Sequence, residues 1–393
     1  MKKALFAGAA LAALGVVTLA SCGQKETGTI IYQAENPTTT YKWDRNHDGK
    51  LGYVMMIGDK GHNDSNARTE GARNALKKMG EELNITIVEL ASKEMKNNTG
   101  ATWDASTAGD TMGVWISQFD KQLDAVISNN DGMASAAYGS SNWIKGLPIF
   151  GFDALPSAAN DIVGEKLAGS ITQNGDAQAR IVAQLLRNFA DGVENPTTTG
   201  ITKEDAKGNK VQRCKVDYNE AERKLLVPCG GVTKENANDY LSGSFEEMTE
   251  NKGTKTLKVL VTIYNQGDNF LKEVYKPAFE HYGKKLNIEF TFVEGDGSQE
   301  TSCLDKFTNL DSYDAYVVNM VKTESGSLYT EKLNTEKNKD KPLIFYNRQP
   351  FVNGKVDEKT MKHNDKTYYI GVDTNGSGDL QGKMITDWFK ANK

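Results

Sequence analysis

The sequence predicts an α/β protein of two lobes, each built on a parallel sheet with helices on both faces. Short apolar runs of strand character alternate with amphipathic helical stretches from Leu51 onward. A polar region over 193–222 breaks this rhythm, and the alternation restarts near residue 257. A chain of 393 residues also exceeds what one compact core usually serves. These observations together favour two α/β units over one.

The first unit alternates strands with helices. Its predicted strands are Gly52 to Ile57, Ile85 to Leu90, Asp124 to Ser128 and Pro148 to Phe152. The helical stretch from Glu70 carries apolar residues on one face, namely Ala72, Ala75, Leu76, Met79 and Leu83. Further helices are expected over 110–119 and 177–190. Strand and helix repeated in this way are typical of a parallel sheet.

The second unit repeats the design. Its predicted strands are Val259 to Ile263, Ile288 to Val293, Ala315 to Asn319, Leu343 to Tyr346 and Tyr368 to Val372. Helices are expected over 269–286 and 381–391, and a short strand over 224–227. Residues 242–256 are expected to be a polar linker. Two such units with a cleft between them fit a hinged architecture that closes on a ligand.

The composition argues against some classes of function. The net charge is −5 with interspersed signs and no basic stripe, which argues against nucleic-acid binding. Hydrophobic residues make up 38%, with 37 Gly and 8 Pro, as expected for a globular protein with many turns.

The N-terminus has the pattern of an export signal over residues 1–21. Lys2 and Lys3 precede a weakly apolar run that ends in Leu-Ala-Ser before Cys22. This Ala- and Gly-rich run is too weakly apolar for a membrane span, which needs roughly 20 strongly apolar residues. The Leu-Ala-Ser-Cys sequence resembles the bacterial lipobox, which implies acylation of Cys22 and a tether over 22–42. The chain would then be held at a bacterial membrane by lipid alone.

Three cysteines remain, at positions 214, 229 and 303. An exported protein could oxidise a pair, and Cys214 and Cys229 flank a predicted hairpin near Asn219. Because register decides whether two cysteines on a hairpin face each other, their disulfide status stays open.

Two clusters of polar and aromatic residues follow predicted strands. The first spans 58–64 with Arg68, and continues with Trp103 and with Asn129-Asn130-Asp131. The second spans 264–270 and continues over 345–348. In α/β folds the ends of parallel strands present ligand-binding groups. A hexose needs carboxylate, amide and guanidinium groups around its ring plane and aromatic rings on its C–H faces. The two clusters are therefore interpreted as opposite walls of a sugar pocket.

The quoted segments carry a resemblance. Asn-Asn-Asp-Gly-Met, Gly-Phe-Asp-Ala-Leu-Pro and Thr-Ile-Tyr with Asp-Asn-Phe resemble the bacterial periplasmic glucose/galactose-binding proteins, the soluble receptors of ABC sugar importers and of sugar chemotaxis. The resemblance covers about 43–192 and from about 257 to the C-terminus. It implies the type I periplasmic-binding-protein fold, with two Rossmann-like parallel sheets joined by a hinge. Because the two segments stand in the reverse of the family's order, it also implies a circular permutation, which surface ends near one another allow.

The resemblance implies an arrangement of the lobes. The first lobe would be built from 43–172 and completed by about 223–241 and 374–393. The second would be built from 173–222 and 257–373. Carried over by position, the sugar-binding residues are His62, Asp64, Arg68, Trp103, Asn130, Asp153, Gln173, Tyr264, Asp268, Phe270 and Asn347. A further Asn of the family aligns near Gln173 or Asn174, and this position departs from the family pattern.

Each of these residues has a plainer interpretation. His62 could simply sit on a loop, Trp103 could be a core residue, and Asp268 could be a helix N-cap. The joint pattern, with the members at strand ends, favours the pocket.

A second candidate site is the loop 44–50, which has the oxygen spacing of a calcium loop at positions 1, 3 and 5 with Gly at 6. The resemblance implies a structural calcium ion held by Asp44, Asn46, Asp48, Lys50 and Asp124. Position 9 is Gly52, and Asp124 is shorter than the family's Glu. The alternative is a metal-free turn rich in Asp and Asn.

The expected function is a monomeric, lipid-anchored periplasmic binding protein, not an enzyme, that delivers glucose or galactose to an ABC permease. The sequence does not separate the two sugars, which differ only at O4. A chemoreceptor partner in place of, or beside, the permease is the alternative. A glycosidase is a further alternative, since the pocket contains three aspartates. It is disfavoured because carboxylates near Arg68 should stay ionised.

Overall fold

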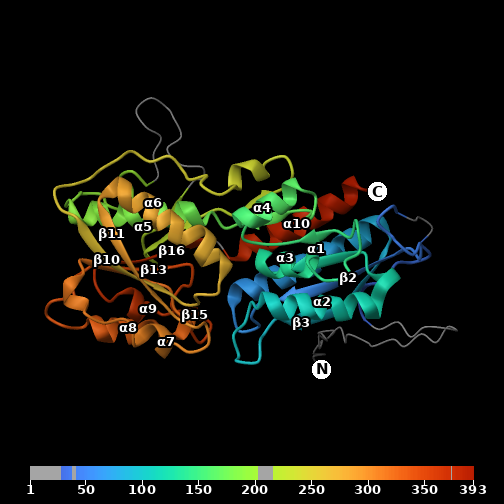
Figure 1. Cartoon of the computed structure of the whole chain (residues 1–393), viewed down its shortest axis with the longest axis horizontal. Helices are drawn as coiled ribbons and strands as arrows, with labels where there is room; N and C mark the ends of the chain where they lie inside the picture. Colours follow the sequence, from blue (N-terminus) through green and yellow to red (C-terminus); the bar gives the residue numbers. More distant parts are fainter. Residues whose placement is uncertain (1–27, 38–40, 202–215, 373) are drawn as a thin grey trace, which may run out of the picture.

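Two α/β lobes lie side by side in the computed structural model (Figure 1), which describes residues 28–37, 41–201, 216–372 and 374–393. The export signal, Cys22 and Cys214 lie outside these ranges. Among the helices described, none combines the length and apolar character that crossing a bilayer requires.

The first lobe contains a five-stranded sheet in the order β1-β3-β2-β4-β5. All neighbours are parallel except β1 and β3. The strands are β1 Thr29–Tyr32, β2 Lys50–Ile57, β3 Thr86–Glu94, β4 Ala125–Ser128 and β5 Ile149–Phe150. A short antiparallel pair, β6 Ser170–Thr172 with β9 Gly230–Val232, continues this edge through a bridge between Phe150 and Gly169.

Helices cover both faces of this sheet. On one face α1 Asn63–Leu83 packs along α10 Thr374–Ala391. On the other lie α2 Ala105–Phe119, α3 Asp131–Tyr138 and α4 Pro156–Val163, with the 3-10 turns η1 Asp120–Gln122 and η2 Ala237–Tyr240 nearby. The alternating apolar residues of β2 divide between the two layers: Leu51, Tyr53 and Met55 face α1, and Val54 and Met56 face α2. The C-terminal helix therefore completes the first lobe, as the sequence predicts.

The second lobe contains a seven-stranded sheet in the order β11-β10-β12-β13-β16-β8-β7. It is parallel except for β7. Its strands are β7 Asp217–Asn219, β8 Lys224–Val227, β10 Leu257–Ile263, β11 Ile288–Glu294, β12 Ala315–Val318, β13 Leu343–Tyr346 and β16 Thr367–Val372.

Helices again lie on both faces of the second sheet. One face is covered by α5 Gly175–Ala190, the π-helical turn η3 Leu271–Tyr275 and α6 Lys276–Leu286. The other carries α8 Gly326–Leu333 and α9 Glu358–Met361. Shorter elements are α7 Thr301–Leu304, η4 Leu310–Ser312, η5 Thr323–Ser325 and the hairpin β14 Phe351–Val352 with β15 Lys355–Val356. This is the two-lobed type I fold that the sequence predicts.

Two boundaries differ from the predicted ones. The tether expected over 22–42 contains β1, which adds an antiparallel edge strand to the first sheet. The segment 223–241, expected in the first lobe, begins with β8, which pairs with β16 in the second sheet. The crossing between lobes therefore falls at 228–229, between β8 and β9, and not before residue 223.

Four connections join the lobes. Three are short: β6 to α5, β8 to β9, and β16 to α10. The fourth is the segment 241–256, which leaves η2 beside α4 and reaches β10 in the second lobe. We call residues 241–250 the strap. It is anchored on the second lobe by Glu246, which is 2% exposed and accepts a 2.7 Å hydrogen bond from Arg180 Nε in α5. The predicted linker is thus anchored to the fold at Glu246, with Met248 also buried.

Candidate ligand-binding site

Arg68 is at the centre of the first-lobe wall. Its guanidinium is held by the backbone carbonyl of Asn129, which accepts a 2.7 Å hydrogen bond, and by the ring of Phe152, whose centroid is 3.6 Å away. Two carboxylates share its charge: Asp153 Oδ1 at 3.6 Å and Asp64 Oδ2 at 3.9 Å. Arg68 is only 3% exposed, so this arrangement is fixed by the core beneath it.

His62 and Trp103 extend this wall. His62 is the N-cap of α1, and its Nδ1 accepts a 3.2 Å hydrogen bond from the backbone N–H of Asp64. Its ring meets the Trp103 ring edge to face, with centroids 6.0 Å apart. Trp103 lies directly against Gly58, where an added Cβ would stand 2.2 Å from the indole. Burial lowers the pKa of His62 to about 4, against the opposing charge of Asp64, so the ring is neutral at pH 7.

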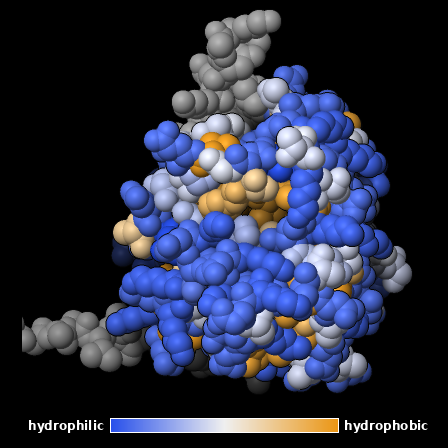
Figure 2. Space-filling model, turned by 90° about the vertical axis from the view of Figure 1, so that its left-hand side faces the viewer, coloured by the Kyte–Doolittle hydropathy of each residue, from blue (hydrophilic) through white to orange (hydrophobic). Residues whose placement is uncertain are grey.

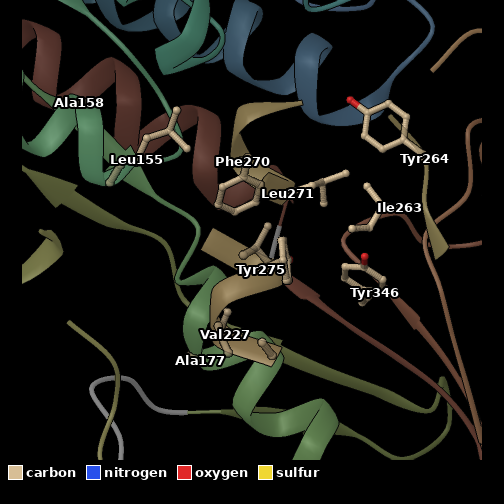
Figure 3. Close-up of a cluster of buried hydrophobic side chains, with 14 of the residues drawn as sticks. Leu155, Ala158, Ala177, Val227, Ile263, Tyr264, Phe270, Leu271, Tyr275 and Tyr346 are labelled. Carbon is tan, nitrogen blue, oxygen red and sulfur yellow. The ribbon is translucent and has the colours of Figure 1, made fainter. Parts of the chain in front are cut away.

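The second-lobe wall follows β10. The Tyr264 hydroxyl donates a 2.5 Å hydrogen bond to Asp268 Oδ2, while Asp268 Oδ1 accepts a 3.1 Å bond from the backbone N–H of Leu271. Asp268 therefore caps a helical turn and also faces the cleft. Phe270 packs edge to face on Tyr275, with ring centroids 5.1 Å apart (Figure 3). The guanidinium of Arg348, 3.7 Å above the Tyr264 ring, covers its other face.

The two walls meet. The Ser157 hydroxyl donates a 2.8 Å hydrogen bond across the lobes to Glu273 Oε2. Burial raises the pKa of Asp153 well above its usual range; Arg68 opposes this, and the charge of Asp268 in the other lobe adds to it. The two lobes are therefore in contact in the described structure, and the charge of Asp268 acts on Asp153 across the cleft.

The other three predicted residues lie at the same edges, with local roles. Asn130 caps α3, its Oδ1 accepting a 2.8 Å bond from the Met133 N–H. Gln173 donates a 2.6 Å bond to Asp153 Oδ1, which orients that carboxylate. Asn347 has a positive φ of 59° and lines the larger cavity at the lobe junction.

Two cavities lie beside the predicted residues, the larger lined by His62, Asp64 and Asn347 among them and the smaller by Asp153. The larger, about 720 Å³, runs from the N-terminus of α1 to the second lobe. It is lined by Gly61, His62, Asn63, Asp64, Asn66, Ala67, Glu70, Lys224, Leu226, Thr323, Glu324, Asn347, Arg348, Gln349, Phe351, Asn353, Gly354, Tyr369 and Val372. The smaller, about 180 Å³, touches Asp153 and is bounded by residues 240–245 of η2 and the strap.

Three polar atoms on the first-lobe wall are buried without a hydrogen-bond partner in the described structure: His62 Nε2, Arg68 Nε and Trp103 Nε1. A buried unpaired donor typically costs about 1–3 kcal/mol. Three such atoms on one wall of an interlobe cleft are what a polar ligand would satisfy, and this pattern indicates a binding site.

Two buried asparagines support these walls. Asn129, which belongs to the first cluster of the sequence but not to the predicted sugar-binding residues, is fully buried and donates to Ser65 and Thr69 in α1. Sequence reasoning missed Asn319, which is fully buried and whose Oδ1 accepts a 3.1 Å bond from the Tyr264 N–H. Asn319 directly follows β12, so the strand-end pattern that found Asn130 could have found it.

The loop 44–50 closes on itself. Asp44 Oδ2 accepts from the Gly49 N–H at 2.9 Å, and Asp48 Oδ1 accepts from the Lys50 N–H at 3.0 Å. Asp124 accepts from the N–H groups of Arg45 and Gly52 at 3.0 and 2.9 Å. Burial raises the pKa of Asp124 to about 8, with smaller contributions from Asp44 and Asp48. The predicted ligands thus gather in one place, Asn46 included through its 3.0 Å bond to Asp48.

This donor set fits a calcium ion incompletely. Across the described residues, no three His, Cys, Asp or Glu side chains are grouped as a metal site would require. The carboxylate oxygens already serve backbone N–H groups, as in a turn rich in Asp and Asn. If an ion binds, Asp44, Asn46 and Asp48 would hold it and Asp124 would support the loop from behind.

The fold and the cleft define a two-lobed α/β binding protein of type I. Two family models, both described as periplasmic binding protein domain, match the chain over residues 22–194 and 256–326. Over these two segments the chain is similar to the periplasmic binding proteins.

Curated relatives match part of the chain. The D-galactose/methyl-galactoside binding periplasmic protein of Haemophilus influenzae is 34% identical over 200 residues, 50% of this chain and 52% of that protein. A xylitol-binding protein of Mycolicibacterium smegmatis is 26% identical over 132 residues, 33% of this chain and 35% of that protein. The chain thus matches about half, or less, of the length of these relatives.

Solved structures share the fold. A carbohydrate transporter protein from Acidothermus cellulolyticus, in complex with myo-inositol, has a TM-score of 0.51 at 10% identity and covers 88% of both chains. A periplasmic binding ribose operon repressor protein from Lactobacillus acidophilus has a TM-score of 0.50 at 12% identity, over 87% of this chain and 91% of that one.

Proposed function

We propose that the protein captures a free hexose, D-glucose or D-galactose, in the interlobe cleft and delivers it to an ABC-type permease. The observation that carries this proposal is the first-lobe wall, where His62, Arg68 and Trp103 each keep one buried nitrogen without a hydrogen-bond partner in the described structure. Asp268 and Phe270 face them from the second lobe. The curated relative from Haemophilus influenzae, which binds galactose by name, supports the sugar class.

The chemistry of the walls suits a hexose. Asp153 and Asp268 would accept hydrogen bonds from ring hydroxyls, and charge-assisted bonds of this kind contribute roughly 1.5–3 kcal/mol each. Trp103 and Phe270 would lie against the apolar C–H faces of the ring. Since these groups come from both lobes, a sugar touching both would favour the closed form over the open one.

Calorimetry against a panel of monosaccharides tests the proposal. Asp268→Ala and Trp103→Ala should each weaken hexose binding at least roughly tenfold, the loss of about one good contact. Asp305→Ala, at an exposed position, is the matched control and should bind like the wild type. Wild-type affinity in both site variants would contradict the pocket assignment.

Incubation with aryl glycosides and with free hexoses separates the binding protein from the glycosidase. The raised pKa of Asp153 is what a glycosidase acid needs, contrary to the expectation that Arg68 keeps the carboxylates near it ionised. Release of product from aryl glycosides would favour an enzyme; binding without turnover favours the receptor. Sugar-dependent association with a permease or with a chemoreceptor in reconstituted membranes would then distinguish transport from sensing.

The proposal places the protein in the periplasm as a monomer, anchored through an acylated Cys22. Mass spectrometry of the mature N-terminus tests this: a diacylated or triacylated cysteine is expected, and an unmodified cleaved end would rule the anchor out. The exchanged order of the two halves stays a prediction. It implies that new termini opened in the strap at Gly243, with a linker joining the present ends, should give a folding and sugar-binding chain.

A further inference from the structure

We propose that the larger cavity is a subsite for a second sugar ring, so that the ligand class extends from a free hexose to a disaccharide. This inference rests on the proposed function, because the first ring is taken to occupy the site between Arg68 and Phe270. The cavity shares His62 and Asp64 with that site on one lobe and Asn347 on the other.

The size of the cavity supports an extended ligand. Its volume of about 720 Å³ lies in the upper part of the roughly 300–1,000 Å³ range of small-molecule pockets. It also reaches well beyond the predicted hexose residues, from Glu70 on α1 to Gly354 in the β14–β15 hairpin. One ring would leave much of this space to water.

The lining has the chemistry of a neutral polyol site. Acidic and basic side chains are mixed in the lining: the charges of Asp64 and Glu324 offset that of Arg348, and Lys224 is paired with Glu222. Phe351 and Tyr369 add aromatic surface. A pocket with donors, acceptors and aromatic faces but no dominant sign of charge suits sugar hydroxyls better than an anion.

Buried groups on this wall also lack protein partners. Arg348 is 6% exposed, and its Nη1 donates a 2.5 Å hydrogen bond to the Val321 carbonyl. No carboxylate of the described chain lies within ion-pair distance of it. Gln349 Nε2 and His62 Nε2 are buried without a hydrogen-bond partner in the described structure. A ligand hydroxyl at these nitrogens would remove the penalty of leaving them unpaired.

The opposite end of the site has no comparable space. The smaller cavity beside Asp153 holds about 180 Å³ and is bounded by Tyr240 to Phe245. Phe245 is fixed there by stacking on His281, with ring centroids 4.3 Å apart. The strap therefore blocks extension past Asp153, and a second ring can project only toward Asn347 and Arg348.

Calorimetry of the full mature chain with glucose, galactose, cellobiose, maltose, lactose and melibiose tests the inference. We expect at least one disaccharide to bind tenfold or more tightly than its free hexose. Asn66→Trp, which fills the cavity from an exposed position on α1, should remove that advantage and leave hexose affinity within about twofold. Asn66→Ala, which does not fill the cavity, is the size control and should keep the tighter binding of the disaccharide.

The outcomes are distinguishable. Hexose binding with no disaccharide preferred, or a preference that survives Asn66→Trp, overturns the subsite while the proposed function stands. Failure of every sugar to bind refutes the proposed function and the subsite with it. Gln349→Leu gives a second readout, since it removes only one unpartnered donor and should lower disaccharide affinity severalfold without filling the cavity.

Discussion

Replacing the buried strap residue Glu246 by Gln should destabilise the second lobe. Glu246 and Arg180 form an ion pair at 2.7 Å with side chains 0% and 1% exposed. Removing one partner of such a pair leaves a buried charge undercompensated, which costs about 3–5 kcal/mol. Arg180 keeps bonds to the carbonyls of Gly200 and Ile201 at 3.1 and 3.2 Å, so the lower end, about 3 kcal/mol, is expected. That is more than a hundredfold in the unfolding equilibrium.

The assay can assign the loss to one lobe. All five tryptophans lie in the first lobe, at positions 43, 103, 115, 143 and 388. Urea unfolding followed by far-ultraviolet circular dichroism reports both lobes, while tryptophan fluorescence reports the first. The dichroism transition of Glu246→Gln should move to lower urea and the fluorescence transition should move less.

Two controls sharpen this prediction. Glu250→Gln changes an exposed strap residue and should stay within about 0.5 kcal/mol of the wild type. The double variant Arg180→Met/Glu246→Met removes both charges and should recover much of the loss. An unshifted dichroism transition in Glu246→Gln would refute the view that the strap is anchored through this pair.

Three further predictions concern the site and the loop. Gly58→Ala should push the Trp103 indole out of place and weaken hexose binding at least fivefold by calorimetry, whereas Gly113→Ala, with open space around it, should not. Hexose affinity should stay flat from pH 8 to about 5 and fall toward pH 4, because the lowered pKa keeps His62 neutral above that; a fall centred near pH 6.5 would contradict this. Because His62 titrates lower in the folded than in the unfolded state, its contribution to stability is full above pH 6.5 and is lost toward pH 4. Millimolar calcium should raise the melting temperature of the wild type but not of Asp44→Ala in scanning calorimetry, and no rise in either would favour the metal-free turn.

Much of the fold could be predicted because its signals are local. The apolar runs of β2, β10 and β13 are buried along almost their whole length, as strands in a parallel sheet covered on both faces should be. The ends of the elements were predicted less accurately than the elements themselves. The helix expected from 110 begins at Ala105, because Asp104 caps it by accepting from the Thr107 N–H at 2.7 Å.

The parts that could not be predicted depend on distant partners. β1 has only four residues, and its partner β3 lies nearly sixty positions further along the chain. The assignment of β8 to the second sheet depends on β16, well over a hundred positions later. Glu246 lies in a polar segment, and the sequence around it does not indicate that it is buried. Its partner Arg180 lies in a separate helix, far away along the chain. Local periodicity carries none of this information.

The positions of the crossings explain how one cleft can both close and stay specific. Three of the four connections leave from the ends of β6, β8 and β16, and Gln173 lies directly after β6. A small rotation about 173–174 and 228–229 changes the distance between walls without breaking any pairing within either sheet. The hydrogen bonds that orient each wall, such as Gln173 to Asp153, bring together groups at the hinge itself. Closure can therefore be selected by a ligand that joins the walls, while the geometry of each wall is fixed beforehand.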